Sequence, residues 1–144
     1  CIICTDALPP TSFPPQPPTA HCTHSPQVCT ADLDAWIRSS LTTKGPAAIG
    51  CPECGNHLTH PDIHRLAAPL TLAAFETAQT RALLSADPNF RWCLSAAACG
   101  SGQLHASGRA GPIMTCGACG FKQCVIHERA WHEGLTCREF DERV

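Results

Sequence analysis

The stretch from Cys116 to Cys137 constrains this chain more than any other, because it places four cysteines and two histidines within 22 residues. Its ligand spacing is CxxC, then CxxH, then HxxxxC. Zinc prefers thiolate and imidazole ligands, and a CxxC turn can place two sulfurs on one tetrahedral ion. Six candidate ligands are too many for one such site and too few for two. The stretch therefore predicts zinc sites completed by ligands elsewhere in the chain.

Composition favours metal staples over a large apolar core. Aromatic residues make up 6% of the 144 residues, and the chain has 12 cysteines. Small lobes with so little apolar material need disulfides or metals to fold. Most of the cysteines have another cysteine within a few residues, with histidines at ligand spacing among them, and disulfides do not need histidine. We therefore expect zinc in a reducing compartment, the cytoplasm or nucleus.

Charge argues against a nucleic-acid partner. The formal charge is −2, and twelve thiolates with four zinc ions would move it to −6. Nucleic-acid binding depends on neutralising phosphates, which a net negative module does poorly. No membrane span or signal segment is recognisable, and the start on Cys1 without an initiator Met indicates an excerpt of a longer chain.

The first part of the chain carries seven candidate ligands, one fewer than two tetrahedral sites need. Its proline-dense segment, Leu8–Thr19, is predicted to be an extended, solvent-exposed loop. A helix is predicted over residues Ala31–Leu41. The seven ligands are Cys1, Cys4, Cys22, His24, Cys29, Cys51 and Cys54.

Asp32 is the favoured eighth ligand, because it completes a CxxD pattern with Cys29 and a carboxylate oxygen can bind zinc. His57, His21, a water molecule or an incomplete site are the alternatives. Asp32 also suits the first turn of a helix, where the dipole favours a negative charge, and that role is compatible with ligation.

These residues resemble a RING finger, whose pattern is CxxC, a loop, CxHxxC, CLxxW on a helix, and CPxC. The chain departs from it where Asp32 replaces a cysteine and in two extra residues after His24. Leu33 and Trp36 stand in the CLxxW frame. The resemblance implies a cross-brace, with one ion on Cys1, Cys4, Cys29 and Asp32 and the other on Cys22, His24, Cys51 and Cys54.

The middle of the chain, residues 61–89, has no cysteine and is predicted to be a helical linker. A short helical turn is expected over Asp62–Ala67 and a helix over Leu70–Leu84, which Asp87-Pro88 ends. The longer helix carries a mostly apolar stripe at helical spacing: Leu72, Phe75, Gln79, Ala82 and Leu83.

The last part of the chain supplies the ligands that the opening stretch lacks. A hairpin with Leu104 and Ile113 facing inward is predicted before Cys116. Counting ligands predicts a Cys4 site and a Cys2His2 site, with no ligand left over. The first uses Cys93, Cys99, Cys116 and Cys119, and the second Cys124, His127, His132 and Cys137.

This part resembles the in-between-RING (IBR) zinc finger, which binds two ions in two successive lobes. The phrases FRWCL and WHEGLTC are similar to fungal members, although His127 stands where the family more often has cysteine. A RING, a helical spacer and an IBR finger occur in this order in RING-between-RING (RBR) ubiquitin ligases. The expected fold is thus a small zinc-stabilised α+β chain: a RING at 1–60, a linker at 61–89 and a bilobal IBR finger at 90–144.

The RBR resemblance implies a function. In that family the first RING recruits a ubiquitin-conjugating enzyme charged with ubiquitin, and a second RING supplies a cysteine that takes ubiquitin before it reaches a lysine of the protein substrate. The expected recruiting groove is Ile3, Leu33, Trp36 and Pro52. No catalytic residue is expected in this chain, because all twelve cysteines are assigned to zinc.

An alternative function is also open: a scaffold-type RING ligase or a zinc-dependent protein-interaction module without its own catalytic cysteine. Four histidines lie outside the ligand pattern and are expected to be ordinary solvated side chains: His57, His60, His64 and His105.

Overall fold

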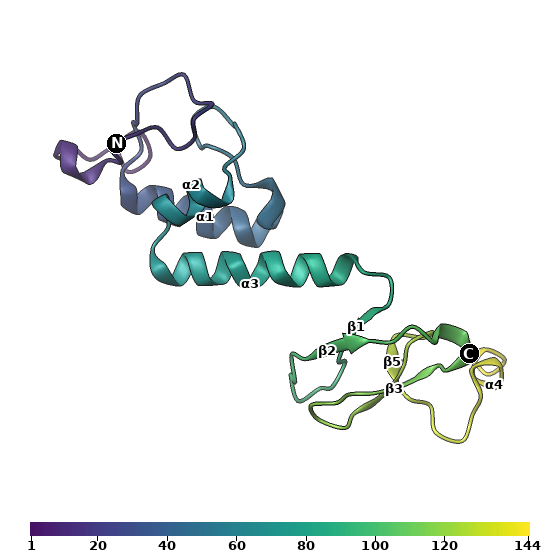
Figure 1. The fold of residues 1–144 in the computed structure, drawn as a ribbon. Coiled ribbons are helices and arrows are strands. Elements are labelled where there is room, and N and C mark those ends of the chain that lie inside the picture. The colour runs from purple at the N-terminus through teal and green to yellow at the C-terminus, as the bar shows by residue number, and fades with distance from the viewer. The chain divides into compact units, whose positions relative to one another are not determined.

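The computed structural model describes residues 1–144 and shows two compact units, residues 1–82 and 83–144 (Figure 1). The first unit is mainly helical, whereas the second is built from short strands. The expected small α+β fold with several cysteine-rich clusters is confirmed. No helix has the length and hydropathy that crossing a membrane requires.

The core of the first unit lies beneath helix α1, Thr30–Lys44. Leu33 and Ile37 are one helical turn apart and fully buried, so one face of α1 is apolar at the spacing that a packed helix needs. The helix ends at Gly45, whose φ of 83° lies in the left-handed region that glycine adopts readily. Leu33 and Ile37 pack with Val28, Ile49, Leu58, Ile63, Leu66 and Phe75.

Two more helices close this core. Helix α2, His60–Leu66, begins with a capping box in which the Thr59 hydroxyl accepts from the Asp62 N–H and the Asp62 carboxylate accepts from the Thr59 N–H. Helix α3, Pro69–Ala86, buries Thr71 and Phe75 in its first two turns. Residues 80–86 of α3 are all exposed. The expected apolar stripe is therefore buried only at its N-terminal end, and Leu83 is 71% exposed.

The proline-dense segment is not the solvent-exposed loop predicted above. It contains a 3-10 turn, Pro10–Ser12, and buries Pro14, Pro18 and Thr19. The Arg65 guanidinium donates hydrogen bonds to the carbonyl oxygens of Pro17 and Pro18, at 3.0 and 2.9 Å. Prolines lack an N–H but keep a carbonyl acceptor, so a cation from α2 can anchor the loop.

The second unit contains two small antiparallel sheets. Strand β1, Phe90–Trp92, pairs with β2, Gly102–Leu104. Strand β4, Lys122–Cys124, lies between β3, Ile113–Thr115, and β5, Arg129–Ala130. A short helix, α4, spans Cys137–Asp141.

The predicted hairpin before Cys116 is wrong, because β2 pairs with β1 and β3 pairs with β4. Leu104 is 66% exposed and Ile113 is 42% exposed, whereas Met114 is buried. Alternate residues of a strand face opposite sides, so an inward Met114 turns Ile113 outward.

A buried glutamine joins the two sheets of the second unit. Gln123 is 2% exposed; its side-chain oxygen accepts from the Leu94 N–H and its side-chain nitrogen donates to the Trp92 carbonyl, both at 2.9 Å. Apart from cysteines, the buried apolar side chains of this unit are Met114 and Val125. Hydrogen bonds and the cysteine clusters thus replace most of an apolar core here.

Candidate metal centres

Sixteen side chains meet in four groups of four, and within each group the ligand atoms all lie within 4.8 Å of one another. One group has four cysteines, one has three cysteines and an aspartate, one has three cysteines and a histidine, and one has two cysteines and two histidines. We number the groups along the chain. Site 1 is Cys1, Cys4, Cys29 and Asp32; site 2 is Cys22, His24, Cys51 and Cys54; site 3 is Cys93, Cys99, Cys116 and Cys119; site 4 is Cys124, His127, His132 and Cys137.

The spacing within the groups fits a tetrahedral zinc ion. Zn–S bonds of about 2.3 Å place two sulfurs about 3.8 Å apart across a tetrahedron. The Sγ–Sγ distances are 3.6 Å for Cys22–Cys54, 3.6 Å for Cys93–Cys119, 3.9 Å for Cys99–Cys116 and 3.7 Å for Cys124–Cys137. A disulfide would need about 2.05 Å, and all twelve cysteines are free. The donor sets and distances are therefore compatible with zinc in all four groups.

The three CxxC pairs share one turn. In each, the N–H of the residue after the second cysteine donates to the carbonyl of the first, at 2.8–3.0 Å. That residue has a positive φ: 63° at Thr5, 76° at Gly55 and 74° at Gly120. The positive φ closes the turn and brings both sulfurs to one side, which explains glycine at two of the three positions.

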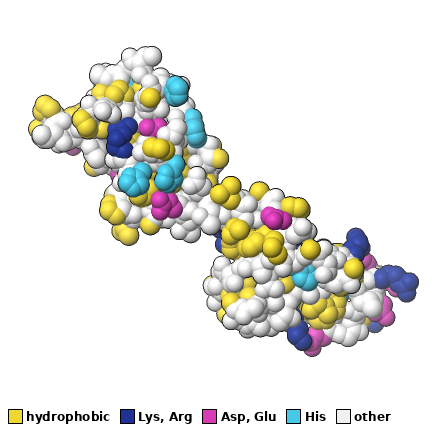
Figure 2. Space-filling model, in the orientation of Figure 1, with side chains coloured by type: hydrophobic (Ala, Val, Ile, Leu, Met, Phe, Trp, Pro, Cys, Tyr) yellow, Lys and Arg dark blue, Asp and Glu magenta, His cyan; other side chains and the backbone are white.

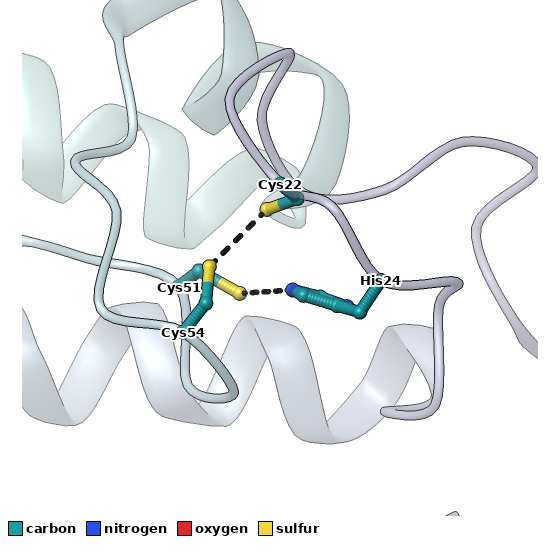
Figure 3. A group of neighbouring side chains, drawn as sticks. All are labelled: Cys22, His24, Cys51 and Cys54. Atoms are coloured by element: carbon teal, nitrogen blue, oxygen red, sulfur yellow. Dashed lines mark hydrogen bonds between the residues drawn. The ribbon is translucent and has the colours of Figure 1, made fainter.

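Site 2 joins the first loop of the chain to the CPEC turn (Figure 3). His24 Nε2 lies 3.4 Å from the Cys51 sulfur. The other ring nitrogen, Nδ1, lies 3.2 Å from a Glu53 carboxylate oxygen and 3.0 Å from the Ser25 carbonyl. These acceptors favour a proton on Nδ1, which leaves Nε2 free to bind a metal.

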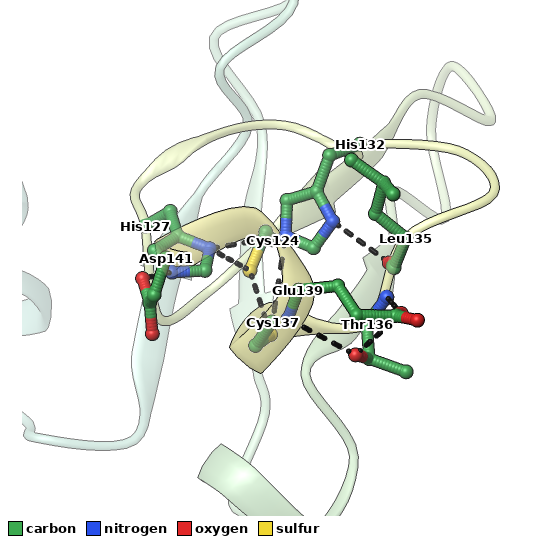
Figure 4. A network of polar contacts seen from close by, with 8 residues as sticks. All are labelled: Cys124, His127, His132, Leu135, Thr136, Cys137, Glu139 and Asp141. Atoms are coloured by element: carbon green, nitrogen blue, oxygen red, sulfur yellow. Dashed lines mark hydrogen bonds and ion pairs between the residues drawn. The ribbon is translucent and has the colours of Figure 1, made fainter. Parts of the chain in front are cut away.

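Site 4 has the same arrangement around both of its histidines (Figure 4). His127 Nδ1 lies 3.0 Å from His132 Nε2, and these two atoms face the cysteines of the site. On the outer side, His127 Nε2 is 2.8 Å from an Asp141 oxygen, and His132 Nδ1 is 3.0 Å from the Leu135 carbonyl. An acceptor thus sets the tautomer of each imidazole that faces the site.

Without a metal, the thiols of one site have unequal acidities. Backbone N–H groups of Cys119 and Ala118 lower the pKa of Cys116 to about 6. Although the Ser95 backbone opposes the effect, desolvation and the neighbouring thiols raise the pKa of Cys93 to about 12. One thiolate is therefore stabilised while like charge keeps its neighbour protonated. A divalent cation removes this repulsion, as the chemistry of a Cys4 zinc site requires.

Site 1 contains Asp32, and neither His57 nor His21 belongs to any of the four groups. An Asp32 oxygen lies 3.0 Å from the Cys1 sulfur and 3.2 Å from the Cys29 sulfur. Hydrogen bonds from thiols, first Cys4 and then Cys29, lower the pKa of Asp32 and keep it a carboxylate, the form that binds metal. The structure thus places Asp32 where the site lacks a fourth thiol.

Sequence reasoning missed Glu53 and Asp141, the carboxylates behind the histidines of sites 2 and 4. Glu53 lies inside the CPEC turn and Asp141 nine residues after His132, so neither has a ligand spacing of its own. The only available clue is chemical: a metal-binding histidine needs a hydrogen-bond acceptor for its other ring nitrogen, so an acceptor near each histidine can be expected.

Replacing Asp141 with asparagine is expected to weaken zinc binding at site 4 by about 10–100-fold, the usual cost of losing such an acceptor. An amide accepts more weakly from the His127 ring and carries no charge. Zinc affinity would be measured by competition with a chromogenic chelator. Glu142→Gln is the matched control, because Glu142 pairs with Arg138 at 3.6 Å and touches no ligand. Equal affinities for the two variants would contradict this role of Asp141.

The residues of the expected recruiting groove differ in exposure. Ile3 is 47% exposed, and Trp36 and Pro52 are half-buried. Leu33 is 0% exposed, so its assignment to the groove is wrong: it faces the core because α1 packs on that side. The Trp36 indole donates a 2.8 Å hydrogen bond to the Gly50 carbonyl, which ties α1 to the loop that leads into the CPEC turn.

Comparison with known proteins agrees with this arrangement. The family profile described as "IBR domain, a half RING-finger domain" matches residues 73–137. The chain is 30% identical over 140 residues to E3 ubiquitin-protein ligase RNF19B of Mus musculus, covering 95% of the chain and 18% of that protein. It is 30% identical over 112 residues to E3 ubiquitin-protein ligase RNF19A of Homo sapiens, covering 76% of the chain and 13% of that protein.

The chain therefore spans less than a fifth of the length of these curated relatives. The domain match covers most of α3 and the second unit as far as Cys137, while the longer alignment extends over the RING-like first unit as well. The IBR match, the four cysteine-rich groups and these relatives together support the assignment of the chain as a fragment of the RING-between-RING (RBR) type.

Proposed function

We propose that this chain is the recruiting region of a ubiquitin-protein ligase of the RBR type, acting in the cytoplasm or nucleus. The observation that carries the proposal is the order of the metal centres: two interleaved sites in the first unit, then two successive sites in the second. Four zinc ions would hold these sites and stabilise the loops between their ligands. The similarity to two E3 ubiquitin-protein ligases supports the same assignment.

The first unit would bind a ubiquitin-conjugating enzyme through Ile3, Trp36 and Pro52. Ile3 lies inside the first CxxC turn and Pro52 inside CPEC, so sites 1 and 2 each hold one of these side chains in place. The hydrogen bond from the Trp36 indole to the Gly50 carbonyl holds this ring against the loop that leads into the CPEC turn. Exposed or half-buried apolar side chains on a rigid frame are suitable anchors for a partner protein. The IBR finger and α3 would position the charged enzyme for transfer.

The transfer itself would need a cysteine outside the four sites. In transthiolation, a thiolate attacks the carbonyl carbon of the ubiquitin thioester, a new thioester forms and the conjugating enzyme's cysteine leaves as thiolate; a substrate lysine amine then attacks the new thioester. Each cysteine of this chain lies in one of the four groups that could hold a metal ion. A thiolate shared with a zinc ion is a poor nucleophile, so none of the twelve is proposed as the acceptor.

Replacing Ile3 with alanine is expected to weaken binding to a ubiquitin-conjugating enzyme at least tenfold, about 1.4 kcal/mol, because an anchor side chain is lost from the interface. Binding would be measured by NMR titration of the zinc-loaded protein with a panel of conjugating enzymes. The adjacent Ile2 is 56% exposed and lies outside the expected groove, so Ile2→Ala is the matched control. If no enzyme of the panel binds, or both variants bind equally, the proposed surface is wrong.

The same samples test where the acceptor cysteine lies. After incubation with a charged conjugating enzyme, we expect no ubiquitin adduct on the 144-residue chain that reducing agents remove. Such an adduct would show that one of the twelve cysteines is an acceptor. Binding without transfer by the whole protein would instead favour the scaffold-type alternative.

A further inference from the structure

We propose that the first unit carries a fifth cation site, formed by His60, His64 and Glu76 on its surface. The proposed ligand is a divalent transition-metal ion such as zinc, held by two imidazoles and one carboxylate and exchangeable with solvent. None of these residues belongs to sites 1 to 4. Figure 2 shows histidine side chains gathered beside an acidic side chain on one face of this unit.

The two histidines are one helical turn apart on α2. Side chains four residues apart on a helix are neighbours, and histidines with this spacing can bind one zinc ion from the same face. The ring centroids of His60 and His64 are 6.4 Å apart. Zn–N bonds are about 2.0–2.1 Å, so the side chains must rotate for both imidazoles to reach one ion, and their exposure leaves room for that rotation.

Glu76 supplies the third donor from α3. One of its oxygens lies 3.3 Å from His60 Nε2, close to the separation of two donors on one tetrahedral ion. The side chains of His60 and Glu76 are 44% and 51% exposed, and His64 is exposed as well. The remaining coordination positions would therefore be open to water. This exposure distinguishes the proposed site from the cysteine-rich centres, each of which has a buried cysteine.

The helices that carry these side chains, α2 and α3, are anchored by residues that pack in the buried core. Ile63 and Leu66 of α2 and Phe75 of α3 belong to the buried core. The Phe75 ring lies against His60, with centroids 5.9 Å apart. The backbone positions of the three donors are thus set by packing, and only their side chains need to adjust.

The basic residue next to His64 in the chain has its own partners outside the proposed site. Arg65 follows His64 in the chain, but its guanidinium donates to the carbonyls of Pro17 and Pro18 and lies 3.7 Å from an Asp62 oxygen. The Arg65 guanidinium therefore anchors the proline-dense loop by hydrogen bonds and does not belong to the proposed site. The expectation that His60 and His64 are ordinary solvated side chains overlooked Glu76, which is twelve residues from His64 in sequence.

The test is a titration of zinc chloride into the zinc-loaded 144-residue protein, followed by calorimetry and by NMR of the histidine rings. We expect one additional ion per chain, with shifts of the His60 and His64 ring signals. His64→Gln and Glu76→Gln are each expected to weaken this event at least tenfold, about 1.4 kcal/mol. Native mass spectrometry checks that both variants keep the tightly bound ions.

His57→Gln is the matched control, because His57 is an exposed histidine of the same unit outside the proposed group. It should leave the additional event unchanged. Absence of a saturable event, its survival in His64→Gln, or its loss in His57→Gln would each overturn the proposal. The outcome does not depend on whether a conjugating enzyme binds.

Discussion

Removal of zinc by a strong chelator is expected to unfold both units. Structural zinc binding contributes about 10–16 kcal/mol of apparent free energy per site, whereas a small domain is stable by only about 5–15 kcal/mol in total. The second unit is the extreme case, because Met114 and Val125 are its only buried apolar side chains besides cysteines. Far-UV circular dichroism and NMR shift dispersion would report the loss of structure, which added zinc should reverse.

The two units should differ in how much secondary structure remains after zinc is removed. The first unit keeps a buried cluster around Leu33, Ile37 and Phe75, so α1 can retain some helix without metal. The strands of the second unit pack on no comparable cluster of buried apolar side chains. Chelator saturated with zinc beforehand is the control and should have no effect. A metal-free protein with native shift dispersion in the second unit would show that zinc is not what stabilises it.

The metal centres are the part of this molecule that sequence reasoning reaches best. A CxxC pair and a tetrahedral ion each allow few geometries, so ligand type, spacing and count restrict the possible pairings severely. In the second unit, counting ligands and the structure give the same two groups, whereas in the first unit the structure brings together the two groups that the RING resemblance implies. Asp32 could be considered because a carboxylate at CxxD spacing from Cys29 has the reach of the missing thiol.

Packing away from the metals was harder to predict. The RBR resemblance implies a partner contact for Leu33, whereas the side chain is 0% exposed, because it lies on the same apolar face of α1 as Ile37. The sequence predicts an inward-facing Ile113, whereas the buried position is Met114 and the pairing strand is β4. In strands of three residues, a shift of one residue reverses which side chains are buried, and so few residues carry too little periodicity to decide.

The carboxylates that orient the histidines were missed for a different reason. Asp141 reaches His127 from the end of α4, and Glu53 reaches His24 from inside the CPEC turn. Both contacts join segments that come close only once the ligands are assembled. No local pattern encodes them, so they are consequences of the tertiary fold.

Replacing Asp32 with alanine is expected to lower the number of bound zinc ions from four to three. Three thiolates remain in site 1, but the carboxylate that lies 3.0 and 3.2 Å from two of them is lost. Native mass spectrometry in a zinc-buffered solution would count the ions. The second unit should keep its NMR spectrum, because it forms its own compact unit with sites 3 and 4.

Two further variants sharpen this result. Asp32→Cys should retain four ions and bind the fourth more tightly, because a thiolate is the softer ligand. Asp6→Ala removes an exposed carboxylate near the first CxxC turn that belongs to no site and should change nothing. If Asp32→Ala still binds four ions as tightly as the unmodified chain, Asp32 is not a ligand. The loss of an ion in Asp32→Ala alone would show that site 1 depends on an oxygen donor, where sites 2, 3 and 4 use only sulfur and nitrogen.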